Sequence, residues 1–326
     1  MYVKLFHHDR CFDGACSAAI FADFFRKQVD SSAEFGLGGL FHQAKQQFDV
    51  SRFDGDQNVI VDFKYCGSSK LTWWFDHHQS AFLSKEDEQH FRGDRSGKKF
   101  YDPSYRSCTK FIAHVASEKF GYDASAQEEL IRWADIIDGA QYSSAKEAVE
   151  MVAPAMKLTL VLEASEESMT SKIIPLMTSR SLEEIASLPE IQASFEHLYQ
   201  RHVESIDIIR KRSSLRDTVL YFDLSDTSLA GYNKFIPYYL FPESTYTVSV
   251  ADAGFREKIS VGSNPWAAEE PAHNLATLCE RYGGGGHARV GAISYGAGEI
   301  ERARETALKI VRELAGDAPA GAPAES

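Results

Sequence analysis

The sequence predicts an α/β protein with an N-terminal parallel-sheet domain, a helical connector and a smaller C-terminal α/β domain. The chain starts as strand, polar loop and helix, and three short apolar runs near its start end in acidic or imidazole residues. Continuous apolar runs of this length are typical of strands buried in a parallel sheet. The stretch 145–216 contains no glycine and is rich in helix formers, and β-rich segments follow it. These patterns predict the three parts.

The N-terminal elements follow from local patterns. Residues 2–6 alternate as a strand does, and 15–26 repeat apolar side chains at helical spacing, so the two begin a βαβ unit. Ser107 is a candidate helix cap, because its hydroxyl can accept a hydrogen bond from a backbone N–H of the first turn. The other expected elements are strands at 58–62 and 71–75, a helix at 128–137, a glycine-rich connection at 36–39 and an exposed loop at 86–99.

The C-terminal part mixes strands and helices. The expected strands are 218–222, 246–250, 258–261 and 290–295, and the expected helices are 272–282 and 299–314. An end rich in alanine, proline, glycine and serine predicts disorder. The predicted domain limits are 1–145 for the first domain, 146–216 for the helical connector, 217–314 for the second domain and 315–326 for a disordered tail.

The composition predicts a soluble globular protein. The 326 residues are 44% hydrophobic and 25% charged, and the formal net charge is −12. No apolar run approaches the ~20 residues that cross a bilayer, and the five cysteines show no CxxC spacing. We therefore expect a cytoplasmic protein without structural disulfides. Its acidic charge argues against coating long nucleic acid, which needs a basic surface. A short phosphate ester remains suitable where a metal supplies the positive field.

Acidic and imidazole side chains gather at the ends of the predicted elements. Each of them alone is more often a capping or solvated group than a ligand. Because the carboxyl ends of parallel strands meet at one edge of the sheet, however, they can converge. Carboxylates packed together raise one another's pKa unless cations hold them, and mixed carboxylate and imidazole ligands suit Mn²⁺, with Mg²⁺, Fe²⁺ or Co²⁺ as alternatives. The candidates are His7, Asp9, Asp13, Asp62, Asp76, His77, His78, Asp135 and Asp138.

Four consecutive glycines form a second candidate site. Their backbone N–H groups are open to an anion, and two cationic side chains follow them, so the stretch predicts phosphate binding. The alternative is a flexible linker or a helix C-cap at Gly283. The candidates for contact with the phosphate or terminal nucleotide are Gly284, Gly285, Gly286, His287 and Arg289.

A strand and turn before the glycines supply further candidates. Arg256, Ser263 and Asn264 could contact a base or a second phosphate. The pair Asn264–Pro265 is equally typical of an ordinary turn.

Five motifs in order are more specific than any one of them. They read FHHDRCFDGACSA, VIVDF, FDHH, ADIID and GGGGHARVGA. The set resembles the DHH phosphoesterase superfamily, and its last member resembles the C-terminal DHH-associated domain that binds substrate. The resemblance extends from Tyr2 to about Leu314. This superfamily includes nano-RNases and pAp phosphatases, RecJ-type exonucleases, cyclic-dinucleotide phosphodiesterases and exopolyphosphatase-like proteins.

The resemblance implies roles for single residues. His7 and Asp13 would be metal ligands, Asp62 would bridge two metals, and His77 would bind the second. His78 would lie beside the scissile phosphate. One acid of the pair Asp135 and Asp138 would complete the second site, and Asp135 is favoured because it follows Trp133–Ala134 as in RecJ-like members.

One position departs from the family pattern. Members commonly carry an acid two residues before the aspartate of Asp13–Gly14, and Cys11 stands there. We expect Asp9 to replace that ligand. Ligation by a Cys11 thiolate is the alternative, although oxygen-rich sites favour it less.

The resemblance and the cluster together predict a metal-dependent phosphodiesterase or phosphatase. A hydroxide activated by two Mn²⁺ ions, about 3.5–4 Å apart, would attack the phosphorus. Short oligonucleotides or pAp are the favoured substrates. The alternatives are a polyphosphate, pyrophosphate or cyclic-dinucleotide hydrolase, or a non-catalytic nucleotide-binding protein with a degraded metal site. No long duplex and no membrane is expected as a partner, and a homodimer stays open.

Overall fold

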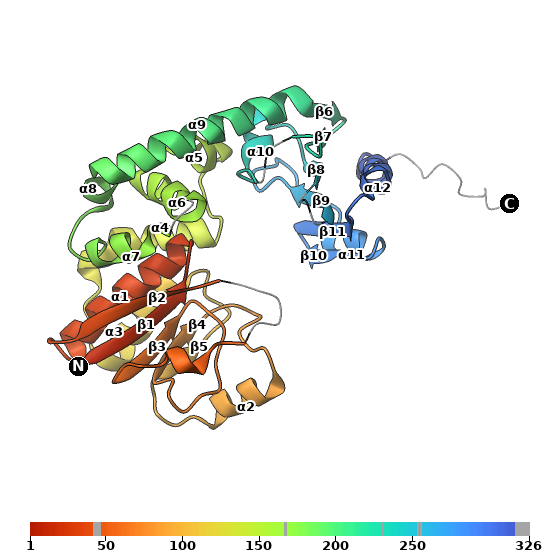
Figure 1. Cartoon of the computed structure of the whole chain (residues 1–326). Coiled ribbons are helices and arrows are strands. Elements are labelled where there is room, and N and C mark those ends of the chain that lie inside the picture. The colour runs from red at the N-terminus through yellow and green to blue at the C-terminus, as the bar shows by residue number, and fades with distance from the viewer. Residues whose placement is uncertain are drawn as a thin grey trace. The chain divides into compact units, whose positions relative to one another are not determined.

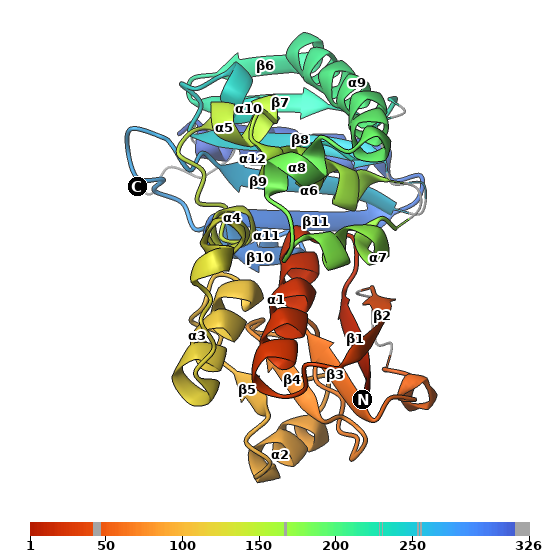
Figure 2. The same ribbon diagram turned by 90° about the vertical axis from the view of Figure 1, so that its left-hand side faces the viewer.

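The computed structural model describes residues 1–41, 47–165, 168–227, 229, 231–252, 254 and 256–316 (Figures 1 and 2). The chain divides into two compact units. The first comprises Met1–Tyr142 and Met151–Leu198, and the second comprises Ser143–Glu150 and Tyr199–Ser326. Each unit contains one sheet, and the two are described separately below.

The first unit is built on a five-stranded sheet with the order β2-β1-β3-β4-β5, in which every pairing is parallel. Residues at the carboxyl ends are in register, since His8 is paired with Leu40, His7 with Val61, and Val61 with Phe75. The side chains that follow these strands therefore meet at one edge of the sheet. The strands are β1 Tyr2–His8, β2 Glu34–Leu40, β3 Gln57–Val61, β4 Trp73–Asp76 and β5 Lys99–Tyr101.

Aromatic side chains fill both faces of this sheet. On one face α1 packs through Phe21 and Phe24 against Trp73, with ring centroids 5.8 and 5.7 Å apart. On the other face Phe6 and Trp74 belong to a separate buried cluster. The helices of the unit are α1 Phe12–Gln28, α2 Lys85–Gly93, α3 Cys108–Phe120, α4 Glu128–Asp138, α6 Pro154–Ala164, α7 Thr170–Ile173 and α8 Leu182–Ala186, with 3-10 turns η1 Val50–Arg52, η2 Ser125–Gln127 and η3 Ile174–Leu176.

The predicted connection at 36–39 is wrong, because these glycines lie inside strand β2. Their lack of side chains makes room for neighbouring groups. A Cβ on Gly36 would lie 2.0 Å from the Tyr2 hydroxyl, and one on Gly38 would lie 2.6 Å from the Phe6 ring. Glycine here reflects close approach within the sheet rather than a flexible turn.

The predicted loop at 86–99 is also wrong over most of its length. Helix α2 occupies Lys85–Gly93, and the Ser84 hydroxyl caps it by accepting a hydrogen bond from the Asp87 N–H at 3.1 Å. Acidic residues fill the first turn and basic ones the last, which suits the helix dipole. The helix packs through Phe91, whose ring centroid lies 5.2 Å from that of Trp74. The predicted Ser107 cap of α3 is confirmed.

The second unit contains a mixed six-stranded sheet with the order β10-β11-β9-β8-β7-β6. Its pairings are antiparallel except that of β7 with β8. Helices α11 and α12 supply Leu278 and Ile310 to its buried core. The strands are β6 Ser213–Arg216, β7 Val219–Asp223, β8 Tyr246–Asp252, β9 Arg256–Ser263, β10 Gly285–His287 and β11 Val290–Gly296; the helices are α5 Ala145–Glu150, α10 Ile236–Leu240, α11 Leu275–Glu280 and α12 Ile300–Leu314. Helix α9 Pro189–Arg212 starts in the first unit and belongs to the second from Tyr199 on.

The predicted fold class is confirmed, with a parallel sheet first, a helical middle and a mixed sheet last. The described residues of 146–216 form most of helix α5, helices α6 to α9 and the 3-10 turn η3, with short non-helical connections, and then β6. They are shared between the two units. Of the predicted tail, residues 317–326 lie outside the described part of the chain. Within the described residues, no helix combines the length and apolar character needed to cross a membrane.

Candidate metal centre

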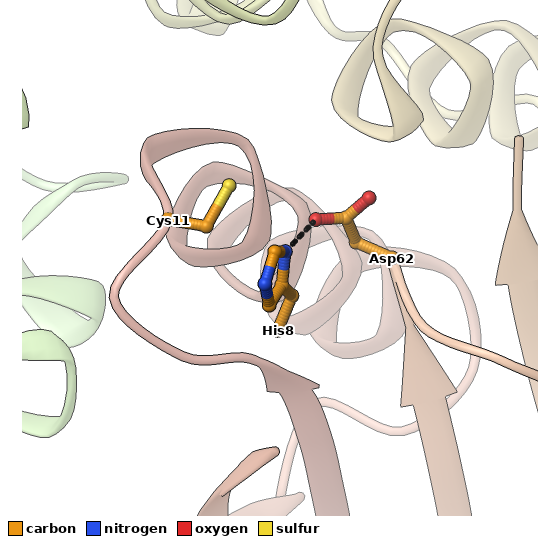
Figure 3. A group of neighbouring side chains, drawn as sticks. All are labelled: His8, Cys11 and Asp62. Carbon is orange, nitrogen blue, oxygen red and sulfur yellow. Dashed lines mark ion pairs between the residues drawn. The ribbon is translucent and has the colours of Figure 1, made fainter. Parts of the chain in front are cut away.

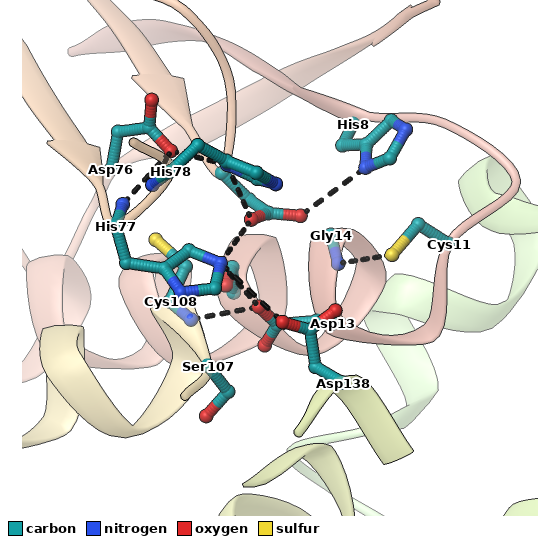
Figure 4. A network of polar contacts seen from close by, with 12 residues as sticks. His8, Cys11, Asp13, Gly14, Asp76, His77, His78, Ser107, Cys108 and Asp138 are labelled. Carbon is teal, nitrogen blue, oxygen red and sulfur yellow. Dashed lines mark hydrogen bonds and ion pairs between the residues drawn. The ribbon is translucent and has the colours of Figure 1, made fainter. Parts of the chain in front are cut away.

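Three overlapping groups of side chains at the carboxyl edge of the first sheet could each hold a metal ion. Within each group the ligand atoms lie within 4.8 Å of one another. They come from the ends of β1, β3 and β4, the start of α1 and the end of α4 (Figure 4). The groups are Asp13, His77 and Asp138; Asp62, His77 and His78; and His8, Cys11 and Asp62.

Asp62 belongs to two of these groups and lies at their centre. Its Oδ1 is 3.5 Å from His77 Nε2 and 3.8 Å from His78 Nδ1, and its Oδ2 is 3.5 Å from His8 Nδ1. Both oxygens are buried and have no hydrogen-bond partner among the described residues. Burial would raise the pKa of Asp62, but the imidazoles of His77 and His8 hold it below its usual value. The carboxylate is therefore charged and lacks the donors that a buried anion requires.

The backbone of Asp62 is held in an unusual conformation. Its φ is +55°, in the left-handed region, and its N–H donates to the Phe75 carbonyl at 2.9 Å. A non-glycine residue with positive φ is strained, and such strain is concentrated at functional sites. The Asp62 carboxylate faces His8 at the end of β1 and lies on the side of the loop that carries Cys11 (Figure 3).

His77 is oriented by a backbone carbonyl. Its Nδ1 lies 3.0 Å from the Tyr105 carbonyl oxygen, to which only a protonated Nδ1 can donate. Its buried Nε2 has no hydrogen-bond partner among the described residues and lies 3.5 Å from Asp138 Oδ2 and 3.8 Å from Asp13 Oδ2. Burial lowers the pKa of His77, but the carboxylates of Asp62 and Asp13 outweigh it and raise the pKa to about 10. Binding of a cation at Nε2 would displace that second proton.

Asp13 connects the cluster to the start of α3. Its buried carboxylate accepts hydrogen bonds from the N–H groups of Cys108 at 2.7 Å and Thr109 at 3.0 Å. Burial and the nearby charge of Asp62 nevertheless raise the pKa of Asp13 well above its usual value. The same two causes raise the pKa of Asp138 to about 6. The carboxylates repel one another in this arrangement, and a cation would relieve that repulsion.

Asp76 supports the cluster from behind. Its Oδ1 accepts hydrogen bonds from the His77 N–H at 2.9 Å and from His78 Nδ1 at 2.7 Å. Burial lowers the pKa of His78, but its contact with Asp76 and the charge of Asp62 raise it overall. Asp76 thus fixes the turn that carries both histidines.

The end of β1 contributes His8, and the loop after it contributes Cys11 (Figure 3). The Cys11 thiol also accepts a hydrogen bond from the Gly14 N–H at 3.5 Å, which caps α1. Burial and the negative charges of Asp62 and Asp13 raise the pKa of Cys11 well above its usual value. The thiol is therefore neutral unless a cation binds beside it.

His8 was not predicted as a ligand, and the structure places it where His7 was expected. His7 is buried, and its Nδ1 lies 3.1 Å from the His8 carbonyl oxygen. Successive residues of a strand point to opposite sides, so only one of the pair can face the cluster. The sequence signals an imidazole at this strand end but does not tell which of the two turns toward Asp62.

Asp9 and Asp135 lie outside the three groups. Asp9 Oδ1 accepts hydrogen bonds from the hydroxyls of Ser168 at 2.6 Å and Thr170 at 2.7 Å, so it ties the loop to the start of α7. Asp135 is paired with Lys110 at 2.8 Å. Of the pair three residues apart on α4, the structure brings Asp138 and not Asp135 to the cluster.

The donors present fit a divalent cation. Carboxylate oxygens and imidazole nitrogens are the ligands that Mn²⁺ and related ions accept. The partnerless oxygens of Asp62 and the partnerless Nε2 of His77 face one another, and three carboxylates share the site. Asp62 and His77 each take part in two groups, but His77 offers only Nε2 because its Nδ1 faces the Tyr105 carbonyl. Asp62 offers two oxygens and is therefore the residue better placed to contact two ions.

The predicted phosphate-binding glycines lie in the second unit, where Gly284 and Gly286, but not Gly285, leave no room for a side chain. Gly283 has φ +78° and lies two residues beyond Arg281, the C-cap of α11, so it turns the chain as the helix ends. Gly286, in the β10–β11 hairpin, leaves no room for a side chain, since a Cβ would lie 2.2 Å from the Val290 carbonyl oxygen. His287 and Arg289 are exposed at this hairpin, and Arg289 is paired with Glu270.

Arg256 and Asn264 are not brought together. Strand β9 starts at Arg256 and ends at Ser263, next to Asn264, and its seven steps of ~3.3 Å separate the two ends by roughly 23 Å. The buried Asn264 amide donates to the carbonyls of Pro242 and Ser244 and accepts from the Trp266 N–H. Its polar atoms therefore stabilise the turn, which agrees with the interpretation of Asn264–Pro265 as an ordinary turn.

No protein-family model matches this sequence, and no curated protein sequence matches it. Among solved structures, a pGpG-specific phosphodiesterase, PggH from Vibrio cholerae, matches with a TM-score of 0.69 at 17% identity, covering 98% of this chain and 100% of its own. A DHH-domain structure from a protein assigned to a family of ribosomal proteins matches with a TM-score of 0.56 at 14% identity, covering 97% of this chain and 87% of its own. RecJ from Thermus thermophilus in complex with Mn²⁺ has a TM-score of 0.49 at 10% identity, over 96% of this chain and 52% of its own.

Proposed function

We propose that this protein, which has the fold of the DHH phosphoesterase superfamily, is a metal-dependent phosphoesterase that hydrolyses small phosphate esters. The observation that carries the proposal is the buried Asp62 carboxylate, whose two oxygens lack hydrogen-bond partners among the described residues and face the imidazoles of three histidines. A cation at this site would supply the partners that the Asp62 oxygens lack and would offset the repulsion among the carboxylates.

The position of each site residue indicates its proposed role. Asp62, His77, Asp13 and Asp138 would hold metal, with His8 and Cys11 on the other side of Asp62. A divalent ion bound there supplies a low-pKa water and offsets charge on the phosphoryl group. His78, held by Asp76 through Nδ1, is placed to donate a hydrogen bond to a phosphoryl oxygen.

Short substrates fit the charge of the protein. A formal net charge of −12 disfavours long nucleic acids, which bind through many basic contacts. PggH, which shares the fold, acts on the dinucleotide pGpG. We therefore favour short oligonucleotides or pAp over long polymers, with Mn²⁺ as the first metal to test.

A substrate panel with metal titration tests the proposal. The wild-type protein should hydrolyse a short oligonucleotide or pAp in Mn²⁺ and should lose this activity in EDTA. Asp62→Asn and His77→Gln should each lower kcat by about a hundredfold or more, a loss expected when a positioned charge at the reacting centre is removed. His114→Gln, an exposed histidine on α3, is the matched control and should retain activity. Full turnover by either site variant would refute the proposed mechanism.

Cys11 supports one alternative. A neutral thiol where the family pattern has an acid weakens the site for hard cations, and a protein that binds nucleotide without hydrolysing it would result. Nucleotide binding without turnover in Mn²⁺, Mg²⁺ and Co²⁺ would establish that alternative. Including polyphosphate, pyrophosphate and cyclic dinucleotides in the panel decides between the enzyme classes.

A further inference from the structure

A cavity lies in the first unit, next to the candidate metal centre. Its volume is about 140 Å³. Whole drug-sized ligands occupy ~300–1,000 Å³, so this cavity has room for one ring system rather than a complete substrate. Its lining comes from the end of β2, from the 3-10 turn η1 and from the residues that follow β3.

The cavity and the metal centre share one edge of the sheet. Phe63 and Lys64, which line the cavity, directly follow Asp62. Leu40, another lining residue, is the register partner of His8, and the Phe63 ring centroid lies 6.1 Å from that of His8. A ligand in the cavity would thus be a neighbour of a phosphate held at the cluster.

Aromatic rings form much of the lining. Phe41 is 48% exposed, an unusual position for a large apolar side chain next to a polar site. Phe48 and Phe63 are partly buried and pack on the core cluster beneath them, and Tyr65 belongs to that cluster. Exposed ring faces beside a phosphate site are the surfaces on which nucleobases stack.

The described lining residues carry more positive than negative side chains, whereas the chain as a whole has a negative net charge. Among the described lining residues, the charged side chains are the cations Arg52 and Lys64 and the carboxylate Asp49. Asp49 Oδ1 is engaged by Ser51, whose N–H and hydroxyl lie at 3.0 and 2.7 Å. Arg52 is held over the Phe6 ring at 4.8 Å and donates to the Gly39 carbonyl at 3.4 Å. A cationic, ring-lined cavity on a chain of net charge −12 selects an aromatic group that carries negative charge.

We propose that this cavity binds one nucleotide unit of the substrate, with the base against Phe41 and Phe63 and its phosphate near Lys64. The inference rests on the proposed function, because it assigns the specificity of the same site. It predicts that the enzyme discriminates nucleotides from base-free esters and polyphosphates within its first unit.

Binding measured without metal tests the cavity apart from catalysis. Calorimetric titrations would use the full chain in EDTA with GMP, AMP, ribose 5-phosphate and pyrophosphate. At least one nucleotide should bind about fivefold or more tightly than ribose 5-phosphate, the size expected from stacking one base. Phe41→Ala should remove this preference, and Lys64→Gln should weaken nucleotide and ribose 5-phosphate by about the same factor.

Matched variants separate the possible results. Lys70→Gln, an exposed lysine outside the cavity, should change nothing. Asp62→Asn should retain nucleotide binding in EDTA even where hydrolysis is lost. Binding that depends on Phe41 in a protein without any hydrolase activity would support the cavity and refute the proposed function.

Two results would overturn the inference alone. One is the absence of nucleotide binding at millimolar concentrations, and the other is an unchanged preference in Phe41→Ala while the Mn²⁺-loaded enzyme still cleaves dinucleotides. Because Phe41 is exposed, its variant should keep the wild-type melting temperature, which confirms that a loss of binding is not a loss of folding.

Discussion

His77 Nδ1 lies 3.0 Å from the backbone carbonyl oxygen of Tyr105. This contact decides which ring nitrogen faces the three carboxylates, because a carbonyl can only accept a hydrogen bond. It leaves Nε2 directed at Asp62 and Asp138, each at 3.5 Å. A second, independent constraint comes from Asp76, which accepts a hydrogen bond from the His77 N–H at 2.9 Å. The imidazole is thereby held in the orientation that the metal-binding role proposed for it requires.

Divalent metal should stabilise the folded protein. An ion that binds only the native state adds about 2.7 kcal/mol at a hundred times its Kd. The melting temperature should therefore rise with Mn²⁺ concentration in calorimetry. Asp62→Asn should remove the rise and should add no backbone strain, since asparagine tolerates the positive φ found there. Asp54→Asn, an exposed control, should retain it. An equal rise in both variants would place the metal elsewhere.

The Cys11 thiol should set the metal preference. Cys11→Asp introduces a hard ligand beside His8 and Asp62, and aspartate is also a good helix cap, so Mn²⁺ should bind about tenfold more tightly without loss of stability. Cys11→Ser should weaken Cd²⁺, a thiol-seeking ion, more than Mn²⁺. Calorimetry on both variants checks this, with Cys66→Ser as the control. Affinities for both ions that do not change in Cys11→Ser would show that the thiol is no ligand.

Asp9 should act as an anchor for the loop and not as a ligand. Asp9→Asn weakens charge-assisted bonds from the hydroxyls of Ser168 and Thr170, which should reduce the free energy of unfolding by roughly 1–3 kcal/mol. Its Mn²⁺ affinity should fall by less than about tenfold. Thr170→Val, which removes one of the donors, should show the same pattern at smaller size. A complete loss of one metal in Asp9→Asn, with stability unchanged, would make Asp9 a ligand after all.

The second unit should lose stability in mild acid through His202. This buried side chain lies with Nε2 2.8 Å from the Val149 carbonyl oxygen, and burial lowers its pKa below the ordinary 6.5. Because the unfolded chain takes up the proton first, His202 contributes stability that is complete above pH ~6.5 and is lost as the pH falls toward its folded pKa.

Denaturant unfolding in EDTA at several pH values checks the sign. His202→Gln keeps a donor but does not titrate, so its free energy of unfolding should fall less between neutral pH and pH ~5 than that of the wild type. His197→Gln, an exposed histidine on the same helix α9, should follow the wild type. A larger loss of unfolding free energy in acid for His202→Gln than for the wild type would show that the pKa of His202 is not lowered by folding.

Local sequence patterns predicted most elements of the first sheet and the edge where the site lies. Runs such as 58–62 carry their own evidence, because a buried parallel strand is apolar throughout and its polar terminus is visible. Strand β2 was not predicted. Its glycines are needed because the side chains of Tyr2 and Phe6 lie against them, and this contact is not visible in the local sequence. Helix α2 escaped because its charged residues resemble a loop until Phe91 is seen to pack on Trp74.

Local sequence was enough to predict the fold class and the kinds of side chain that gather at the candidate site, which are carboxylates and imidazoles at the ends of the first strands. Which member of each neighbouring pair faces the cluster depends on packing between distant segments. His8 is placed there instead of His7, since the two point to opposite sides of the strand. Asp138 is placed there instead of Asp135, since Lys110 pairs with Asp135 while His77 reaches Asp138. Sequence spacing predicts which residues can lie on the same face of a helix or strand. Which of them contacts the cluster depends on side chains from distant parts of the chain.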